Sequence, residues 1–92
     1  MKNNITEDKI ERYHVLTTKA LEIAKKSVAR GKKKQAKEIF LIVECYLKDS
    51  LFFKEKKDFV NAFGCLNYAH GWLDCGARLK VFIVKDTRLF TV

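Results

Sequence analysis

A polar face on the third predicted helix holds the residues best suited to acid–base chemistry. Its members, which fall within about 80° of one another on a helical wheel, are Asn67, His70, Asp74 and Arg78. His70–Asp74 and Asp74–Arg78 are both i,i+4 pairs, so the carboxylate could orient the imidazole while the guanidinium holds an anionic group. The same spacing favours a solvent face stabilised by weak ion pairs, and no nucleophile or second catalytic partner accompanies it. We therefore expect no enzymatic activity, and an enzyme centred on His70 and Asp74 is our second alternative.

A second candidate is a run of cations between the first two predicted helices. The segment 25–37 (KKSVARGKKKQAK) contains no acidic residue and seven basic ones: Lys25, Lys26, Arg30, Lys32, Lys33, Lys34 and Lys37. We expect Lys25, Lys26 and Arg30 to close the first helix, where positive charge suits its dipole. The second helix opens with Lys32, Lys33 and Lys34, where positive charge opposes its dipole. The cations at the start of the second helix, together with the free backbone amides there, could bind phosphate. Nucleic-acid binding by charge alone would be weak and salt-sensitive, and a solvated lysine-rich corner explains the same run.

Metal and cofactor chemistry is not indicated, and we predict neither. His14, His70 and the cysteines never occur at ligand spacing, and a structural zinc needs about four ligands. The three cysteines form no C-x-x-C pair: Cys45, Cys65 and Cys75. Their odd number favours a reducing cytoplasm over a disulfide framework. Lone cysteines in helices also predict small buried side chains.

The remaining sequence predicts the elements that must position these residues. A chain of 92 residues, 48% hydrophobic and 33% charged, forms one domain (1–92) with a small core. No apolar run reaches the ~20 residues of a membrane span. A helical period of apolar residues predicts helices at roughly 6–30, 33–55 and 58–80, with Thr6 and Asp58 as N-caps and Gly31 at the C′ position of the first. The sequence therefore predicts an all-α, three-helix up-and-down antiparallel bundle.

After Lys80 the chain becomes β-branched and aromatic. The segments 81–84 (VFIV) and 88–92 (RLFTV) flank a short polar turn, which predicts a short extended or hairpin tail over 81–92. Because an isolated hairpin is marginal in water, we expect the tail to lie against the bundle. Each mid-helix glycine costs about 1 kcal/mol relative to alanine. We expect Gly76 to lie at a helix crossing and Gly71 to lie at the surface.

Several segments resemble one protein family. These are ERYHVLTTKALEIA (11–24), DFVNAF (58–63), LNYAHGWLD (66–74) and RLFTV (88–92). They are similar to the archaeal family called "domain of unknown function 357". The resemblance implies a small three-helix bundle in an archaeal cytoplasm. It brings no established activity, so no catalytic role is carried over.

An apolar stripe lies on the side of the second predicted helix where polar residues are expected. It consists of Leu41, Cys45 and Phe52. On the first predicted helix, Val15 also lies on the side where polar residues are expected. Such a surface must be covered, either by the tail segment 81–84 or by a second copy. We therefore expect a non-enzymatic interaction module that presents a basic corner and an apolar stripe to a protein partner, with no membrane association. The first alternative is a nucleic-acid-binding accessory protein that uses residues 25–37.

Overall fold

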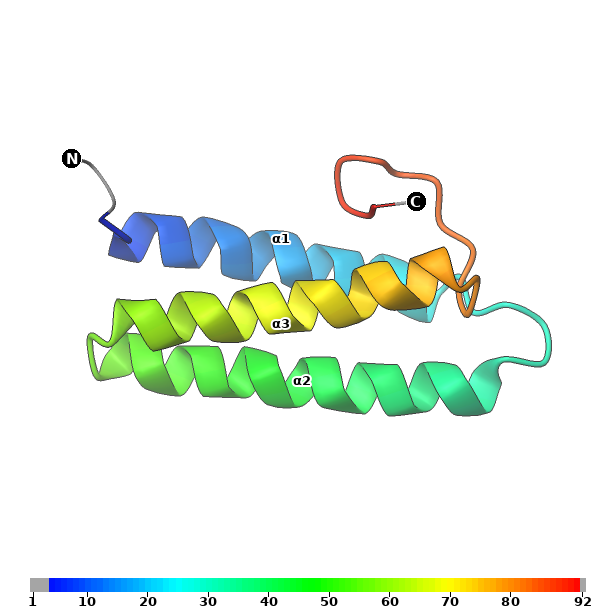
Figure 1. The fold of residues 1–92 in the computed structure, drawn as a ribbon, viewed down its shortest axis with the longest axis horizontal. Coiled ribbons are helices and arrows are strands. Elements are labelled where there is room, and N and C mark those ends of the chain that lie inside the picture. The colour runs from blue at the N-terminus through cyan, green and yellow to red at the C-terminus, as the bar shows by residue number, and fades with distance from the viewer. Residues whose placement is uncertain (1–3, 92) are drawn as a thin grey trace.

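The computed structural model describes residues 4–91, so Val92 of the predicted tail lies outside the described residues. It contains three helices, α1 (Glu7–Lys25), α2 (Lys33–Glu55) and α3 (Phe59–Arg78), which run alternately up and down the bundle (Figure 1). Between residues 4 and 91 the β pairing consists of one isolated bridge, from Val28 to Phe82. The prediction of an all-α, three-helix bundle is confirmed.

The N-termini of α1 and α3 are capped by the predicted side chains. Thr6 Oγ1 accepts a hydrogen bond from the backbone N–H of Lys9 at 3.2 Å, and Asp58 accepts one from the N–H of Asn61 at 3.2 Å. Each cap satisfies one of the backbone donors that a helix start leaves without a partner. The N-cap of α2 is Lys32, whose side chain makes no capping bond. The helix that begins within the basic run therefore starts without a side-chain cap.

The C-termini of α2 and α3 share one turn geometry. Lys57 (φ 60°) and Lys80 (φ 59°) adopt the left-handed conformation just after their helices. The N–H of Asp58 then donates to Phe53 O at 2.9 Å, and that of Val81 donates to Gly76 O at 2.8 Å. These are the bonds of the Schellman motif, which usually places glycine where these lysines stand. The motif directs the chain sharply into α3 and into the tail.

The first helix ends earlier than predicted, at Lys25 instead of Arg30. The tail explains the difference because it pairs with the backbone that would have continued the helix. Ala29 N–H donates to Val81 O at 2.9 Å, and Ile83 N–H donates to Ser27 O at 2.8 Å. Gly31 has the expected positive φ of 79°, but it lies in the α1–α2 connection and not at the C′ position of α1.

Between residues 81 and 91 the tail forms no hairpin, so that version of the prediction is wrong. It also turns at Asp86, whose carbonyl accepts hydrogen bonds from the N–H groups of Leu89 and Phe90 at 3.2 and 3.0 Å. Its first residues pair with the α1–α2 connection instead of with its own second half. Phe82 and Phe90 are buried, and the Phe82 ring stacks on Phe40 with centroids 5.6 Å apart. The tail and the connection thus close the same end of the bundle (Figure 1).

The core runs along the middle of the bundle, with α3 packed against both other helices and most extensively against α2. Its largest fully buried apolar side chains are Ile10, Val43, Leu66, Leu73 and Phe82. Gly76 is buried beside the Phe82 ring, whereas no atom lies within 4 Å of the position that a Cβ would take at Gly71. The surface position of Gly71 is confirmed, whereas the closest neighbour of Gly76 is the Phe82 ring of the tail instead of a crossing helix.

Candidate binding site

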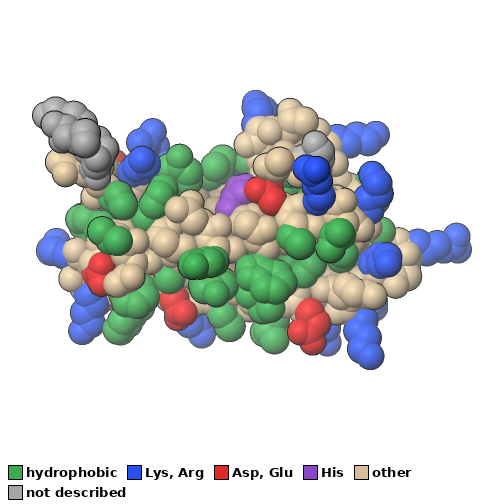
Figure 2. All heavy atoms as spheres, in the orientation of Figure 1, with side chains coloured by type: hydrophobic (Ala, Val, Ile, Leu, Met, Phe, Trp, Pro, Cys, Tyr) green, Lys and Arg blue, Asp and Glu red, His purple; other side chains and the backbone are tan. Residues whose placement is uncertain are grey.

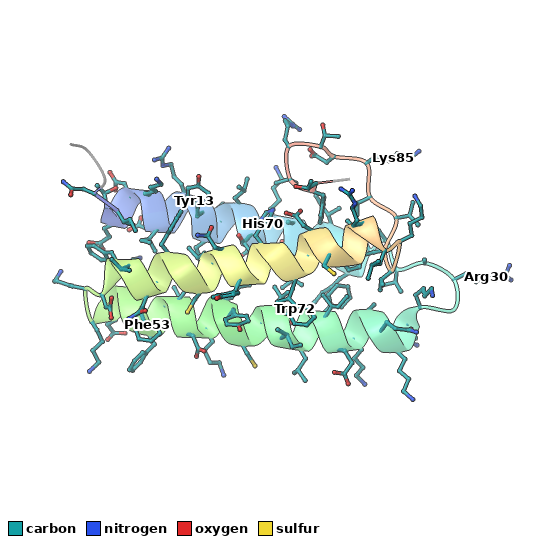
Figure 3. All side chains as sticks on the ribbon, in the orientation of Figure 1. Tyr13, Arg30, Phe53, His70, Trp72 and Lys85 are labelled. Atoms are coloured by element: carbon teal, nitrogen blue, oxygen red, sulfur yellow. The ribbon has the colours of Figure 1, made fainter. Side chains whose placement is uncertain are left out.

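The seven predicted cations gather at the end of the bundle that holds the α1–α2 connection. Lys25 ends α1, and Lys33, Lys34 and Lys37 lie in the first turns of α2, while the other three belong to the connection: Lys26, Arg30 and Lys32. Lys26 closes α1 as its C-cap, whereas Arg30 lies beyond the helix, so the expectation that Arg30 closes the first helix is wrong. All seven are exposed, and Arg30 extends from the tip of the connection (Figure 3).

One of the seven is neutralised within the chain. Lys25 Nζ lies 2.6 Å from Glu44 Oε2 on α2, and both side chains are about half exposed. The remaining six form no ion pair with any other residue of the range 4–91. This end of the protein therefore presents a concentrated positive charge, of which only Lys25 is paired with a carboxylate among residues 4–91.

The same end contains an open groove of about 500 Å³ between the end of α1, the connection and the start of α2. We call it the lysine-rimmed groove. Its floor is apolar and its rim is charged; the floor consists of Val28, Ala36, Phe40 and Leu41, and the rim of Lys25, Lys33, Lys37 and Glu44. The sequence prediction treated the basic run and Leu41 as separate features, and the fold brings them together.

The tail holds the floor of the groove in place. The half-buried Phe40 ring stacks on Phe82, which is fully buried, and Val28 makes the isolated bridge to the same residue. Leu41 differs, because 60% of it remains exposed. A ligand that suits this surface has an apolar side for the floor and negative charge for the rim.

The rest of the predicted apolar stripe lies outside the groove and is not covered by the tail. Val15 is 67% and Phe52 56% exposed, and Cys45 is also exposed. Lys56 Nζ lies 5.6 Å from the centroid of the Phe52 ring, so part of this ring is shielded by a neighbouring side chain. Of the two covers considered for the stripe, the tail segment 81–84 is ruled out, because Val81 and Phe82 pack into the core and the stripe residues stay exposed.

The cysteines are less buried than expected. Cys45 and Cys75 are exposed, and Cys65 is only partly buried. Burial, followed by the negative charge of Asp49, raises the pKa of the Cys65 thiol. Its reactive thiolate form is therefore less populated near neutral pH than in an ordinary cysteine.

His70 on the polar face of α3 makes two contacts to distant parts of the chain. Its Nε2 lies 2.5 Å from Leu89 O, and its Nδ1 lies 3.2 Å from the Thr17 hydroxyl. Because a carbonyl only accepts, Nε2 carries a proton and donates to Leu89 O, while Nδ1 lies within hydrogen-bond distance of the Thr17 hydroxyl. The ring thus joins α1, α3 and the tail, where Figure 3 places it between α1 and α3.

Asp74, the proposed partner of His70, is engaged elsewhere. It accepts hydrogen bonds from the Thr91 N–H at 2.8 Å and the Thr91 hydroxyl at 3.3 Å. No hydrogen bond joins it to His70, so the predicted arrangement in which Asp74 orients an imidazole base is wrong. The other two members, Asn67 and Arg78, are exposed. Two members of the polar face, His70 and Asp74, therefore anchor the tail.

A further pair of polar residues lies on α1, of which the sequence drew attention only to His14, and only as a rejected metal ligand. His14 Nε2 and Thr18 Oγ1 are buried without a hydrogen-bond partner among the described residues. Burial lowers the pKa of His14, and the positive charge of Lys54 lowers it further. The burial of His14 could have been predicted from its spacing, because it follows the core residue Ile10 by one helical turn.

We predict that mild acid destabilises the fold through His14. Its folded-state pKa lies below the ordinary value of 6.5, so the unfolded chain binds this proton more readily. The stabilisation is present above that value and is lost as the pH falls from it toward the folded-state pKa. Urea unfolding between about pH 7 and 5 should therefore show a falling free energy of unfolding, with a shallower fall in His14→Gln. An equal fall in this variant would assign the effect to another group.

Two further properties of the described residues concern metal binding and membrane crossing. Within residues 4–91, no group of three or more His, Cys, Asp or Glu side chains is arranged to hold a metal ion. The helices of this part of the chain also lack the combined length and apolarity of a segment that crosses a membrane.

The fold and its surface define a small all-helical bundle with a cationic, apolar-floored groove at one end. A family model described as "Protein of unknown function (DUF357)" matches residues 12–82, and the chain belongs to this family. The matched region includes the whole lysine-rimmed groove and Phe82, and it ends before Leu89 and Thr91. Neither the curated proteins nor the solved structures that were searched gave a significant match. The resemblance predicted from the sequence is confirmed, and the family description assigns no activity.

Proposed function

We propose that this protein is a non-enzymatic interaction module that binds an acidic, amphipathic helix of a partner protein in the lysine-rimmed groove. The observation that carries the proposal is that one groove is lined both by its apolar floor and by charged residues, namely Lys33, Lys37 and the Lys25–Glu44 pair. The fold could be formed with the basic run and without an exposed apolar residue at Leu41, or with Leu41 exposed and without the basic run. Their convergence on one groove favours a ligand that uses both.

The groove suits a helix because helices recognised in grooves supply apolar anchors three and four residues apart and place polar residues beside them. Leu41 and Phe40 offer apolar surface for such anchors, and the unpaired Lys33 and Lys37 stand one helical turn apart to meet carboxylates. Exposed ion pairs contribute about 0–1 kcal/mol each. The rim therefore serves orientation and association rate, and the floor supplies most of the affinity.

Two observations support a role without catalysis. His70 and Asp74 both hold the tail, and the residues that line the groove provide lysines and one glutamate but no nucleophile beside a base. The three cysteines of the described chain are free thiols, which supports a reducing cytoplasm as the location.

The test is binding of a labelled acidic amphipathic helical peptide, followed by fluorescence anisotropy. Leu41→Asp should weaken binding about tenfold or more, because it places a carboxylate on the apolar floor. Val15→Asp, which adds the same charge at an exposed position on α1, is the matched control and should bind like the parent. A scrambled peptide of identical composition should bind weakly. Equal binding of the two peptides, or no effect of Leu41→Asp, would exclude the groove as the site.

The alternative function is nucleic-acid binding, favoured by the six unpaired cations that lie at one end of the bundle. It predicts retention on immobilised RNA or DNA at low salt and release at high salt. Replacing Lys32, Lys33 and Lys34 together with alanine should abolish retention, and Leu41→Asp should change it little. Unchanged retention in the triple variant would remove this alternative.

A further inference from the structure

The charges along the lysine-rimmed groove are distributed unevenly. The α2 residues that line it are spaced by three and four, so they form one strip along the helix: Lys33, Ala36, Lys37, Phe40, Leu41 and Glu44. Lys33 and Lys37 stand at one end of this strip, and Glu44 stands at the other, about 16 Å from Lys33 along the helix axis at 1.5 Å per residue. Lys25 meets Glu44 at that second end. The groove therefore has a cationic end and an end that carries its carboxylate.

The start of α2 adds positive potential to the cationic end. Its first turn contains no acidic residue, and its N-cap Lys32 makes no side-chain capping bond. The free N–H groups of a helix start carry the positive end of the helix dipole. They lie beside Lys33 and Lys34, neither of which is paired with a carboxylate among residues 4–91. Figure 2 shows the basic side chains that project from this end of the bundle, at the right of the view. This end of the groove therefore attracts the negative end of a ligand.

A helix bound in the groove has two different ends. Its N-terminus carries a partial positive charge and its C-terminus a partial negative charge, each about half an elementary charge. In a helix that runs antiparallel to α2, the C-terminus meets Lys33 and the start of α2, and the N-terminus meets Glu44. In a parallel helix, both ends meet charges of their own sign. Because Lys25 offsets part of the Glu44 charge, the cationic end supplies the larger share of a preference of about fivefold for the antiparallel direction.

We propose that the groove binds its partner helix in one direction, antiparallel to α2, with the C-terminal end of that helix beside Lys33 and Lys37 and its N-terminal end beside Glu44. This inference rests on the proposed function and adds to it the polarity of the partner. The carboxylates of the partner then belong in the C-terminal half of its helix, where they reach the unpaired lysines. A groove wall of about 16 Å accommodates about three turns of such a helix.

Cys45 provides a chemical reporter of this direction. It follows Leu41 by one helical turn on the same side of α2 and comes directly after Glu44. Its thiol is exposed, and it lies just beyond the Glu44 end of the groove. A reactive group on the nearer end of a bound helix should therefore reach this thiol first.

The test uses two forms of the acidic amphipathic peptide that differ only in which end carries a bromoacetyl group. Both termini are blocked and the acidic residues are placed symmetrically about the centre, so that only the helix direction distinguishes the two ends. The Cys45 thiol displaces bromide from the group that lies near it and forms a thioether, which mass spectrometry of the digested protein locates. The peptide labelled at its N-terminal end should modify Cys45 about fivefold faster than the peptide labelled at its C-terminal end. Scrambled peptides should react slowly and equally from either end.

The role of Glu44 is tested by reversing its charge. Glu44→Lys should bring the ratio of the two rates closer to one, because both ends of the groove then carry lysine. Glu38→Lys is the matched control, because it makes the same change of charge at an exposed position of α2 outside the groove. This variant should keep the parent ratio. An unchanged ratio in Glu44→Lys would overturn the role assigned to Glu44.

Equal rates from the two labelled ends, or a faster reaction of the C-terminal label, would overturn the inferred direction. Labelling of Cys45 no faster than that by the scrambled peptides would overturn it as well. Fluorescence anisotropy separates this failure from a failure of the proposed function. If the peptide binds and Leu41→Asp weakens binding, the groove is the site and only the direction is wrong. If the peptide does not bind, the proposed function and the direction both fall.

Discussion

Replacing Gly76 with alanine is expected to destabilise the protein by about 2 kcal/mol. A Cβ at this position would overlap the Phe82 ring and lie 3.1 Å from Ile39 Cδ1. Overpacking of a core costs about 1–3 kcal/mol and occasionally more, whereas the better helix propensity of alanine returns about 1 kcal/mol. Because the added carbon would meet two ring atoms of a fully buried side chain, we expect a cost at or above the upper end of that range. The midpoint of thermal unfolding should fall by roughly 8–16 °C.

The matched control for this experiment is Gly71→Ala on the same helix. No atom approaches the added Cβ there, so propensity alone acts and the variant should gain up to about 1 kcal/mol. Urea unfolding of the two variants should therefore give changes of opposite sign. A stabilised Gly76→Ala would show that the Phe82 ring does not press against α3.

Replacing Phe82 with alanine is expected to cost about 3–5 kcal/mol, the range found for buried aromatic side chains. Phe82 is fully buried, stacks on Phe40, and lies 6.4 Å from the Phe90 ring between centroids. Its loss removes the largest fully buried side chain of the protein. It also weakens the attachment of the tail to the α1–α2 connection, so the amides of Ala29 and Ile83 should exchange faster.

Ile83→Ala is the control for this second prediction, because the neighbouring side chain is 52% exposed and surface changes usually stay within about 0.5 kcal/mol. The double variant Gly76→Ala/Phe82→Ala adds an independent check. Without the ring, the new Cβ has room, so the two changes should be strongly non-additive. Additive losses would mean that the two residues do not meet, and equal losses in Phe82→Ala and Ile83→Ala would mean that the tail is not part of the core.

The helices could be predicted from the sequence because their signals are local. Thr6 and Asp58 are followed by amphipathic segments, and both cap as expected. The end of α1 could not be predicted this way. Val28 continues the apolar period of α1, but its backbone pairs with Phe82, which lies far along the chain. A tertiary contact thus overrides local helix propensity.

The candidate site was predictable in its parts and not in its assembly. The basic run could be predicted from its charge alone. Leu41 could be predicted as an exposed apolar residue because it lies on the polar side of the second predicted helix. Their meeting depends on where α1 ends and on Phe40 being held by the tail. The His70–Asp74 pair shows the opposite case. Its i,i+4 spacing was read correctly, but Thr91 takes Asp74 and Leu89 takes His70, contacts for which a helical wheel contains no information.

The most direct test of the account is a two-dimensional ¹⁵N–¹H NMR titration of the labelled protein with the acidic amphipathic peptide. We predict that the amide signals of Val28, Ala36, Phe40 and Leu41 shift together and saturate, because these residues form the floor of the lysine-rimmed groove. Shifts confined to Lys32–Lys34 that vanish with added salt would show attraction by charge alone and would contradict a groove that binds an amphipathic helix.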